Sequence, residues 1–578
     1  MLKRIVLAAA LLLVLPVQSH LAQDQDVASR TGLVVCVSAP ACDAGAAVLA
    51  KGGNAVDAAV ATSFALAVTH PSAGNIGGGG FMIVRTPSGE LASFDYREKA
   101  PLKSTRTMYV GKDGKINRSL TEAGYLAPGV PGAVRGLELA HKKFGKLPWK
   151  DVVMPGVQLA EQGFPLSSAL ARGLNREVQG RMKPFPASVA AYGKPGGGDW
   201  AQGDRIVLTD LGKTLRAIAE GGADAFYKGP IADLIAADMT ANGGIISKED
   251  LAAYEATERT PVKGTFRGYD IVSMPPPSSG GVALIEMLNI LENFDLKSKG
   301  DRSAEALHLQ IEAMRRAYLD RARHLGDPDF TEVPVAKLTS KEYAKTLAAG
   351  IDPKKATSSV ELGRDIVTTT AQEPDETTHF SVMDRDGMAV TCTTTLEGGY
   401  GSHVVVKGAG FLLNNEMGDF NKKPGETNTT GDIGTTANLI DPGKRMLSSM
   451  TPTMVLKDGK IVMLTGSPGG RTIINTVVSV VLGVTEFGLT GRGAVDRPRT
   501  HHQWLPDNVR IEQGGANGQA LEELKKMGHG AAMLQGRQGD AHTIWVGPDG
   551  VPVGLRDKRT PDSKASAPQR LTSDGSGR

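Results

Sequence analysis

The sequence predicts a layered α+β fold in which helices pack on paired antiparallel sheets. In the C-terminal part, three pairs of strand-like segments flank turns that contain Asp-Gly, which is the pattern of a β-hairpin. These hairpins are expected at residues 377–396, 454–465 and 542–555. A strong helix is expected among them at 471–487, and much of the N-terminal part has helical patterns. Helices and antiparallel hairpins in one chain therefore predict layers of both kinds.

The length, composition and charge of the chain narrow the class of protein. With 578 residues, the chain is too long for one simple domain and long enough for a large core. Its 71 glycines and 5% aromatic residues indicate many tight turns and close backbone approaches. The net charge of +3 is weakly basic and the basic residues form no stripe, so we expect no nucleic-acid partner.

The N-terminus has the pattern of a secretory signal. Lys3 and Arg4 precede an apolar run at 5–16 that is too short to span a bilayer, so a membrane anchor is the less favoured alternative. Cleavage after Ser19 or Ala22 would remove it, and we take residues 1–22 as the signal peptide. No later run of 18 apolar residues occurs, so we expect a periplasmic or secreted protein without stable membrane insertion.

The three cysteines, Cys36, Cys42 and Cys392, are too few for a disulfide scaffold or a cysteine-rich zinc site. Export would permit a disulfide between Cys36 and Cys42, but both could equally be small buried residues, and the sequence leaves these alternatives open. The eleven histidines have no metal-ligand spacing. We expect no metal.

The N-terminal part combines helices with short strands. The helix expected at 55–68 is apolar nearly all round and therefore buried. The four glycines 77–80 indicate backbone packed where side chains have no room, and no Gly-Lys-Ser/Thr follows as a phosphate loop requires. The strand expected at 91–96 is followed by Arg97 and Glu98. As isolated residues, these two would form an ion pair at the protein surface. We expect strands at residues 31–36, 81–85 and 91–96, helices at 41–51, 152–162, 167–172, 211–220, 231–242, 248–251, 283–293 and 303–323, and a hairpin at 262–273.

Two polar segments are expected to be exposed. Residues 326–376 are rich in Pro, Thr, Lys and Asp, which is a natural setting for a proteolytic cut. The tail 559–578 is charged and contains Pro, Ser and Gly, so we expect it to be disordered.

The stretch Asp-Glu-Thr-Thr-His-Phe-Ser at 375–381 lies where the polar segment meets the first C-terminal hairpin. We interpret Glu376–Thr377 as a bond that the protein cuts in itself, which would give Thr377 a free α-amine. Such an amine has an ordinary pKa of about 7.7–8.0, so near neutral pH it can accept the proton of the threonine hydroxyl. Thr-Thr-His is also ordinary strand sequence, so this stretch does not decide the function by itself.

Further motifs occur with TTHFSV at 377–382. They are FDYREKAP at 94–101, TLEGGYGS at 395–402, LLNNEMGDF at 412–420, LSSMTP at 447–452 and TGSPGG at 465–470. As a set, these motifs resemble gamma-glutamyltranspeptidase, a family of N-terminal-nucleophile hydrolases, from about residue 32 to 554. The resemblance implies a precursor that cuts itself into a large subunit, 23–376, and a small subunit, 377–578. The two subunits would stay together as a heterodimer and jointly form a four-layer αββα sandwich.

The resemblance assigns catalytic roles to four residues. Thr377 would be the nucleophile, and Thr395 would hydrogen-bond it and assist the cut. Gly469 and Gly470 precede a predicted helix, so their amides would form an oxyanion hole at its N-terminus. Without the resemblance, these glycines would be interpreted as a strand-to-helix turn.

The resemblance also implies a binding site for the two ends of an amino acid. Arg97 would bind the substrate α-carboxylate with two parallel hydrogen bonds, which a lysine cannot form. Ser448 and Ser449 would donate hydrogen bonds to the same carboxylate. Glu416 and Asp419 would hold the α-ammonium, and their spacing of three residues could place them on one face of a turn.

Two positions depart from well-known members of the family. Glu397 stands where those members have an Asn that contacts the substrate amine. Thr430 stands where some bacterial members carry a gating Tyr, in a loop of equal length at 421–447. Both departures concern specificity and the exclusion of water rather than the catalytic groups.

The implied reaction is a two-stage transfer of a γ-glutamyl group. Thr377 would attack the γ-glutamyl amide of glutathione or a related donor, and water or the amine of an amino acid or peptide would then accept the acyl group. The reaction needs no metal and no organic cofactor. Two alternatives stay open: a glutaryl-type (cephalosporin) acylase on the same fold, and an uncut, inactive exported protein that binds γ-glutamyl compounds.

Overall fold

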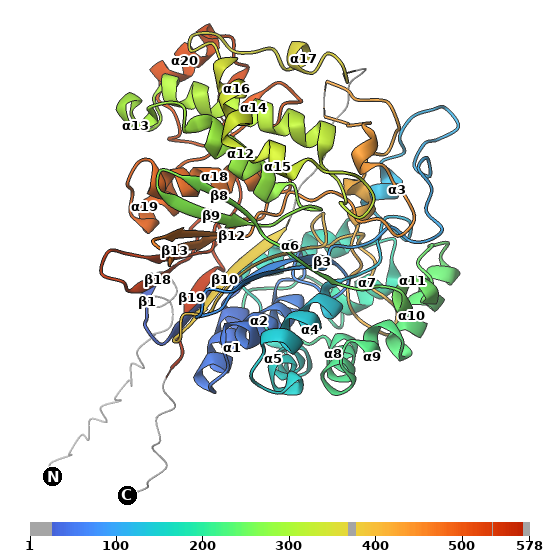
Figure 1. Ribbon diagram of the computed structural model, residues 1–578. Coiled ribbons are helices and arrows are strands. Elements are labelled where there is room, and N and C mark those ends of the chain that lie inside the picture. The colour runs from blue at the N-terminus through green and yellow to red at the C-terminus, as the bar shows by residue number, and fades with distance from the viewer. Residues whose placement is uncertain (1–25, 368–376, 430, 534–535, 570–578) are drawn as a thin grey trace, which may run out of the picture.

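The computed structural model describes residues 26–367, 377–429, 431–533 and 536–569. Two seven-stranded antiparallel sheets are stacked, and helices cover the outer face of each, which gives four layers (Figure 1). The predicted αββα sandwich is therefore confirmed. Among the helices of the described residues, none has the length and apolar character needed to span a bilayer. The expected signal peptide, 1–22, lies outside the described residues.

The first sheet contains the strand that follows Thr377. Its strands are β2 (Gly32–Cys36), β3 (Gly79–Arg85), β4 (Leu91–Asp95), β7 (Thr257–Arg259), β10 (Thr378–Asp384), β11 (Ala389–Thr395) and β19 (Lys564–Ser566). They are arranged in the order β19-β2-β10-β11-β3-β4-β7. β10 is therefore an interior strand, held between β2 and β11 by antiparallel pairing on both sides. This position fixes the backbone next to Thr377.

The second sheet carries the strand that leads to Gly469 and Gly470. Its strands are β1 (Val27–Ala28), β8 (Val262–Phe266), β9 (Tyr269–Ser273), β12 (Thr453–Lys457), β13 (Lys460–Thr465), β17 (Thr543–Val546) and β18 (Pro552–Leu555). Their order is β1-β18-β17-β13-β12-β9-β8. The three hairpins predicted in the C-terminal part and the one predicted at 262–273 are all present.

Strands from before and after Thr377 pair with one another in both sheets. β10 pairs with β2, and β11 pairs with β3. In the second sheet, β12 pairs with β9, and β18 pairs with β1. Separating the two parts of the chain would break these backbone ladders, so we expect them to remain associated after a cut at 376–377.

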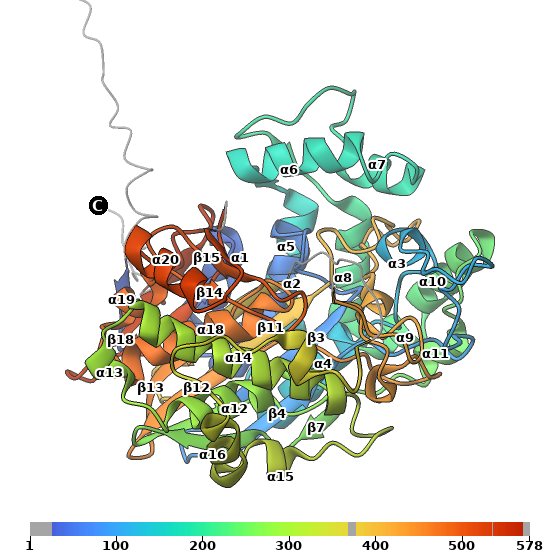
Figure 2. The ribbon, with the colours of Figure 1, turned by 90° about the horizontal axis from the view of Figure 1, so that it is seen from above.

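Helices on the outer face of the first sheet come mainly from the N-terminal part. The helices that contact its strands are α1 (Ala39–Ala50), α2 (Ala55–Thr69) and α4 (Ala133–Phe144), while α5 (Trp149–Gln162) packs on α2 and α8 (Thr209–Gly221) packs on α5. All residues of α2 are buried, as its apolar sequence predicts, and Asn54 caps it in a capping box with Asp57. Around them lie α3 (Ser119–Glu122), α9 (Asp224–Tyr227), α10 (Pro230–Ala241), α11 (Lys248–Ala252), α6 (Ser168–Gln179) and α7 (Pro186–Tyr192), with the short ladder of β5 (Phe164–Pro165) and β6 (Arg205–Ile206). Figure 2 shows α6 and α7 projecting to one side of the layers.

Helices on the outer face of the second sheet come from both parts of the chain. The central ones are α12 (Gly280–Leu291), α14 (Ala304–His324) and α18 (Thr472–Thr485). The others are α13 (Leu296–Lys299), α15 (Val335–Leu338), α16 (Lys341–Ala349), α17 (Ser359–Leu362), α19 (Gly491–Asp496) and α20 (Gly518–Lys526), with a small sheet of β14 (Thr500–His501), β15 (Val509–Ile511) and β16 (Ala531–Met533). Two 3-10 turns, η1 (Glu416–Asp419) and η2 (Thr436–Asn438), lie in the loops that follow β11.

An apolar core fills the space between the two sheets. Leu33 and Phe81 from the first sheet pack with Met454 and Leu464 from the second, and all four side chains are buried. The glycines 77–80 are packed as predicted, since a Cβ on Gly79 would lie only 2.4 Å from the carbonyl oxygen of Tyr96. The sandwich therefore excludes water from the space between the two sheets, to which β10 and β13 belong.

Two polar segments are more ordered than their composition predicts. The expected disorder of the tail is wrong for 559–569, because β19 extends the first sheet by pairing with β2. Residues 326–367 are not a plain exposed segment either, since they form α15, α16 and α17. Leu338, Ala344 and Ala348 join the core next to α12. Residues 368–376 and 570–578 lie outside the described residues.

The three cysteines are buried and unpaired, so a Cys36–Cys42 disulfide is not formed. The Cys42 thiol donates to the carbonyl oxygens of Val34, at 3.1 Å, and Lys564, at 3.0 Å. Of the two alternatives that the sequence left open, these contacts favour small buried residues.

Candidate active site

Thr377 lies at the start of β10, beside the end of β11. The hydroxyl of Thr395 donates to the hydroxyl of Thr377 over 3.5 Å, and it accepts a hydrogen bond of 2.8 Å from the amide of Glu397. The two hydroxyl oxygens are therefore at the outer limit of hydrogen-bond distance, as the sequence predicted for these threonines. Glu376, the other residue of the expected cleavage site, lies outside the described residues.

Gly469 and Gly470 lie in the turn between β13 and α18. Their φ angles are +122° and +49°, in the region that favours glycine. Their carbonyl oxygens accept from the amides of Thr472, at 2.9 Å, and Ile473, at 3.1 Å. Within the described ranges, the amide N–H groups of the two glycines donate no hydrogen bond. These amides are therefore available at a helix N-terminus, as an oxyanion hole requires.

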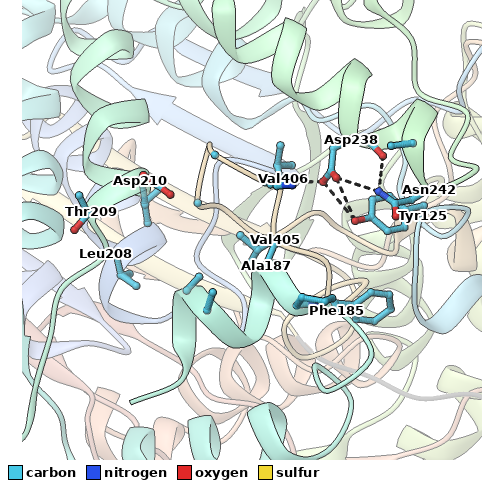
Figure 3. A pocket seen from close by; sticks show the side chains of 18 of the residues that line it. Tyr125, Phe185, Ala187, Leu208, Thr209, Asp210, Asp238, Asn242, Val405 and Val406 are labelled. Carbon is cyan, nitrogen blue, oxygen red and sulfur yellow. Dashed lines mark hydrogen bonds between the residues drawn. The ribbon is translucent and has the colours of Figure 1, made fainter. Parts of the chain in front are cut away.

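A cavity of about 420 Å³ joins the nucleophile to this turn, because Thr377 and Gly469 both line it. A second cavity of about 720 Å³ lies elsewhere, between α7, α8, α10 and the loop 405–410 (Figure 3). In that second cavity, Asp238 accepts hydrogen bonds from Tyr125 and Asn242. Neither Thr377 nor any other predicted site residue lines it. Size alone does not identify the active site, and we assign it to the smaller cavity.

Arg97 is buried, with an exposed fraction of 1%. Its guanidinium forms ion pairs with Glu416 and Asp419, and its Nη2 also donates to the Leu447 carbonyl oxygen at 3.3 Å. Burial disfavours the charged guanidinium, but the carboxylates of Glu416 and Asp419 outweigh burial and raise the pKa of Arg97. The structure thus brings together the residues predicted to bind the two ends of an amino acid. Without substrate, they neutralise one another.

Ser448 and Ser449 follow Leu447 and so lie beside Arg97. The Ser448 hydroxyl accepts from the amide of Met450 at 3.1 Å, and the Ser449 hydroxyl accepts from Arg321 Nη2 at 3.1 Å. Because both hydroxyls act as acceptors in these bonds, each keeps its proton for another partner. This suits the predicted role of donating to a carboxylate.

Glu397 faces η1. A Cβ placed on Gly418, inside η1, would lie 3.6 Å from Glu397 Oε1. Burial is the main cause that raises the pKa of Glu416, and the nearby carboxylates of Glu98, Asp419 and Glu397 raise it further, while Arg97 opposes the shift. The site therefore contains more carboxylates than cations, an excess that a ligand ammonium would compensate.

The loop 421–447 covers this group. Arg471 Nη1 donates to the Gly431 carbonyl oxygen at 3.0 Å, and Arg118 forms an ion pair with Asp432. A small space of about 20 Å³ lies between this loop, Asp419 and Arg321 of α14. Thr430 lies outside the described residues.

Glu98 is buried beside Arg97, so the expectation that these two residues form an ion pair at the protein surface is wrong. Its Oε2 lies 3.5 Å from Arg97 Nη1, and neither carboxylate oxygen has a hydrogen bond of ordinary geometry. Burial raises the pKa of Glu98 to about 7, although Arg97 opposes the shift. Near neutral pH, this carboxyl group is therefore partly protonated in the folded protein.

We expect Glu98→Gln to change the pH dependence of stability. An unfolded glutamate titrates near pH 4.3, so between that pH and about 7 the folded protein holds a proton that the unfolded chain has lost. Wild-type stability should therefore fall as pH rises through this window, by on the order of 3 kcal/mol from this group, and the glutamine variant should lack this decrease. Thermal unfolding at pH 5 and pH 8 measures the difference, with exposed Glu90→Gln as control. Parallel pH dependence in wild type and Glu98→Gln would contradict the prediction.

Several residues that position the site were not predicted from the sequence. Asn75 donates to the Thr395 carbonyl oxygen at 2.8 Å, and Asn438 accepts from the amide of Leu447 at 2.8 Å. Arg321, on α14, connects Ser449 to Ser279. For Asn75, its place two residues before the four glycines was an available signal. Arg321 and Asn438 lie in ordinary helical or loop sequence and offered none.

One group of side chains in the described residues has metal-like spacing: His308, Glu312 and His529. Glu312 is already bonded to two cations, Arg315 and Arg316, and His308 Nδ1 lies 2.7 Å from His529 Nε2, a hydrogen-bond distance. Bound cations disfavour a metal at this carboxylate, so we interpret the group as a buried polar network.

A threonine at the start of an interior strand, in an αββα sandwich with free amides at a facing helix, defines the class of N-terminal-nucleophile hydrolases. The family model for gamma-glutamyltranspeptidase matches residues 41–567. The chain therefore belongs to the gamma-glutamyltranspeptidase family.

Individual relatives are similar over nearly the whole chain. The glutathione hydrolase proenzyme of Escherichia coli (strain K12) is 46% identical over 536 residues, which cover 93% of this chain and 92% of that protein. The acylase ACY 1 proenzyme of Pseudomonas sp. (strain SE83) is 36% identical, covering 90% and 91%.

Two solved structures are similar to this chain. Cephalosporin acylase from Bacillus halodurans superimposes with a TM-score of 0.81 at 28% identity, covering 96% of this chain and 99% of that one. Helicobacter pylori gamma-glutamyltranspeptidase matches at 48% identity and a TM-score of 0.54, covering 55% of this chain and 91% of that one.

Proposed function

We propose that the protein is a self-processing γ-glutamyltransferase and glutathione hydrolase that uses Thr377 as its nucleophile. The observation that carries the proposal is the cavity in which Thr377, with the Thr395 hydroxyl 3.5 Å from its own, meets the turn that contains Gly469. Family membership supports the choice of a γ-glutamyl donor. In this proposal the chain is exported, loses residues 1–22, and is cut between Glu376 and Thr377 into large and small subunits.

The first half-reaction forms an ester. The α-amine of Thr377 accepts the hydroxyl proton as the oxygen attacks the γ-carbonyl carbon of the donor. The amides of Gly469 and Gly470 stabilise the negative oxygen of the tetrahedral intermediate. When the intermediate collapses, the C–N bond breaks, and the α-ammonium returns the proton to the leaving amine.

The second half-reaction transfers the acyl group. Water or the amine of an amino acid or peptide attacks the ester carbon, and the Thr377 α-amine accepts its proton. The C–O bond to Thr377 then breaks, and the proton passes to the threonine oxygen. The products are glutamate or a new γ-glutamyl amide together with the free enzyme. No metal or organic cofactor has a role in either step.

Substrate recognition replaces the ion pairs seen without substrate. The donor α-carboxylate would bind to Arg97, Ser448 and Ser449. Its α-ammonium would bind to Asp419, Glu416 and the neighbouring Glu397. When the ion pairs of Arg97 open, the guanidinium would bind the donor carboxylate, and the acidic side chains would bind the donor ammonium. A zwitterionic amino-acid end therefore suits this site, whereas a ligand with a single charge leaves one group unpaired.

We expect Arg97→Lys to retain processing but lower kcat/KM for γ-glutamyl donors. Arg97 contacts Glu416 and Asp419 through different nitrogens, and the single ammonium of lysine cannot reproduce this fork. The expected loss is about 2 kcal/mol or more, mainly as a higher KM. Steady-state kinetics of the variant and of Arg385→Lys, an exposed control in the turn between β10 and β11, measure it. An unchanged KM would place the carboxylate site elsewhere.

A glutaryl-type acylase is the second candidate, and the similarity to cephalosporin acylase from Bacillus halodurans favours it. Its substrate would lack the α-ammonium and would leave the acidic group around Glu416 without a partner. An uncut binding protein is the third alternative. Rates with γ-glutamyl-p-nitroanilide, with and without an acceptor dipeptide, test the proposal and separate hydrolysis from transfer. Absence of turnover by the purified, cut protein would overturn it.

A further inference from the structure

The cavity of about 720 Å³ lies apart from the proposed reaction, since none of the residues predicted to act on the donor lines it. Its walls come from α7, the first turn of α8, the C-terminal end of α10 and the loop 405–410 (Figure 3). The volume lies within the range of about 300–1,000 Å³ that is typical of small-molecule sites. A ligand in this cavity would therefore be distinct from the γ-glutamyl donor.

Most residues that line this cavity are apolar or aromatic. Ala187 and Val405 lie between its two ends (Figure 3), and Val207 also lines it although its side chain is 45% exposed. The rings of Tyr125 and Phe185 meet edge to face, with centroids 6.3 Å apart and an interplanar angle of 73°. Apolar walls favour a ligand with an apolar body, and the faces of aromatic rings attract cations.

A carboxylate lies at one end of the cavity and is bonded only to neutral donors among the described residues. Asp238 accepts hydrogen bonds from Asn242 at 3.1 Å and from the Tyr125 hydroxyl at 3.4 Å (Figure 3). It also accepts from the backbone amide of Lys407 at 3.2 Å. In the part of the chain that the structure describes, no basic side chain forms an ion pair with Asp238. All three bonds are longer than the roughly 2.7–2.9 Å of hydrogen bonds between a cation and a carboxylate, so Asp238 can still bind a cation.

The surroundings of Asp238 add to the negative charge at this end. Asp238 lies in the last turn of α10, where backbone carbonyls carry partial negative charge and no basic residue offsets it. Burial and the nearby Asp238 raise the pKa of Tyr125 to about 12, so the phenol keeps its proton and donates. The other charged residues that line the cavity are Asp210, which forms an ion pair with Lys213 at 3.0 Å, and Lys407, which is exposed.

We propose that this cavity binds an organic cation, an ammonium group attached to an apolar body. The positive charge would lie beside the Asp238 carboxylate and the rings of Tyr125 and Phe185, and the apolar body would cover the wall at Val405. A metal ion matches the cavity less well, because Ca²⁺ and Mg²⁺ require several oxygen ligands and the carboxylates of Asp238 and Asp210 lie at opposite ends (Figure 3). This site goes beyond γ-glutamyl transfer and does not depend on it.

The first test is calorimetric titration of the purified protein with benzyltrimethylammonium chloride at constant ionic strength. This probe joins a ring to a positive charge, and it has no N–H group that could accept an acyl group. We expect saturable binding, and we expect benzyl alcohol, which has the ring without the charge, to bind at least about tenfold more weakly. Saturating L-glutamate should leave the Kd of the probe unchanged, because glutamate would occupy the separate site at Arg97.

The second test locates the site with three variants. Asp238→Asn should raise the Kd of the probe at least about fivefold, because it removes the charge but keeps an acceptor. Phe185→Leu should raise the Kd about threefold, because it removes a ring but keeps an apolar side chain. Asp233→Asn should bind as the wild type does, since Asp233 is an exposed residue of the same helix that does not line the cavity.

Unchanged unfolding temperatures would show that each variant retains the fold. Absence of saturable binding to the wild type would overturn the inference, and so would equal Kd values for the wild type and Asp238→Asn. Displacement of the probe by L-glutamate would place the cation in the acidic group beside Arg97 and would also overturn it. The proposed function would stand in each case, because it uses other residues.

Discussion

Thr377→Ala is expected to give a single uncut chain without measurable γ-glutamyl transfer. The same hydroxyl that attacks a substrate amide must first attack the carbonyl of residue 376, so one substitution removes both reactions. Loss of a nucleophile typically costs several orders of magnitude in rate, the largest effect expected of any single change in this protein. Thr377→Ser retains a hydroxyl and should still be cut and active.

A denaturing gel and N-terminal sequencing of the smaller band measure this outcome. Wild type should give two bands, and the smaller should begin at Thr377. Because strands from both parts pair with one another in each sheet, the two bands should elute together under native conditions. A different N-terminus, or a cut Thr377→Ala protein, would refute the assignment of Thr377.

Local sequence patterns were enough to predict a layered α+β fold with paired antiparallel sheets, whereas the four-layer sandwich and the role of Thr377 were implied by the family resemblance. Asp-Gly turns marked the hairpins, and the apolar run at 55–68 gave a helix buried on every side. The order of the motifs, through that resemblance, singled out Thr377, Thr395 and the Gly469–Gly470 turn. These features depend on short stretches whose backbone conformation is set by a few residues.

Other features depend on contacts between distant segments, which composition does not describe. Lys564–Ser566 is polar but becomes ordered, because the free edge of β2 offers backbone partners and Asp43 pairs with Lys564. The pairing of Arg97 with Glu416 and Asp419 joins residues more than 300 positions apart. Sequence could name these residues, but it could not predict that the acids would occupy the arginine in the absence of substrate.

The acidic group beside Arg97 predicts strong discrimination between γ-glutamyl and glutaryl donors. A γ-glutamyl donor brings an ammonium to Glu397, Glu416 and Asp419, whereas a glutaryl donor brings only hydrogen to that position. A site built for a polar group rejects an analogue that lacks it, because the unpaired site group costs about 1–3 kcal/mol, and more when charged. We expect kcat/KM for glutaryl-p-nitroanilide to be at least roughly a hundredfold lower than that for γ-glutamyl-p-nitroanilide.

Glu397→Asn tests the source of this discrimination. Glu397 has a φ of +76°, a conformation that asparagine adopts readily, and its carboxylate faces η1. The change removes one negative charge but keeps a hydrogen-bond acceptor, so it should reduce the difference in kcat/KM between the two donors. Equal rates for both donors with the wild-type enzyme would favour the acylase over the transferase. If the large difference in kcat/KM between the two donors persists in the variant, the charge of Glu397 is dispensable. Recognition of the ammonium would then be attributed to Glu416 and Asp419.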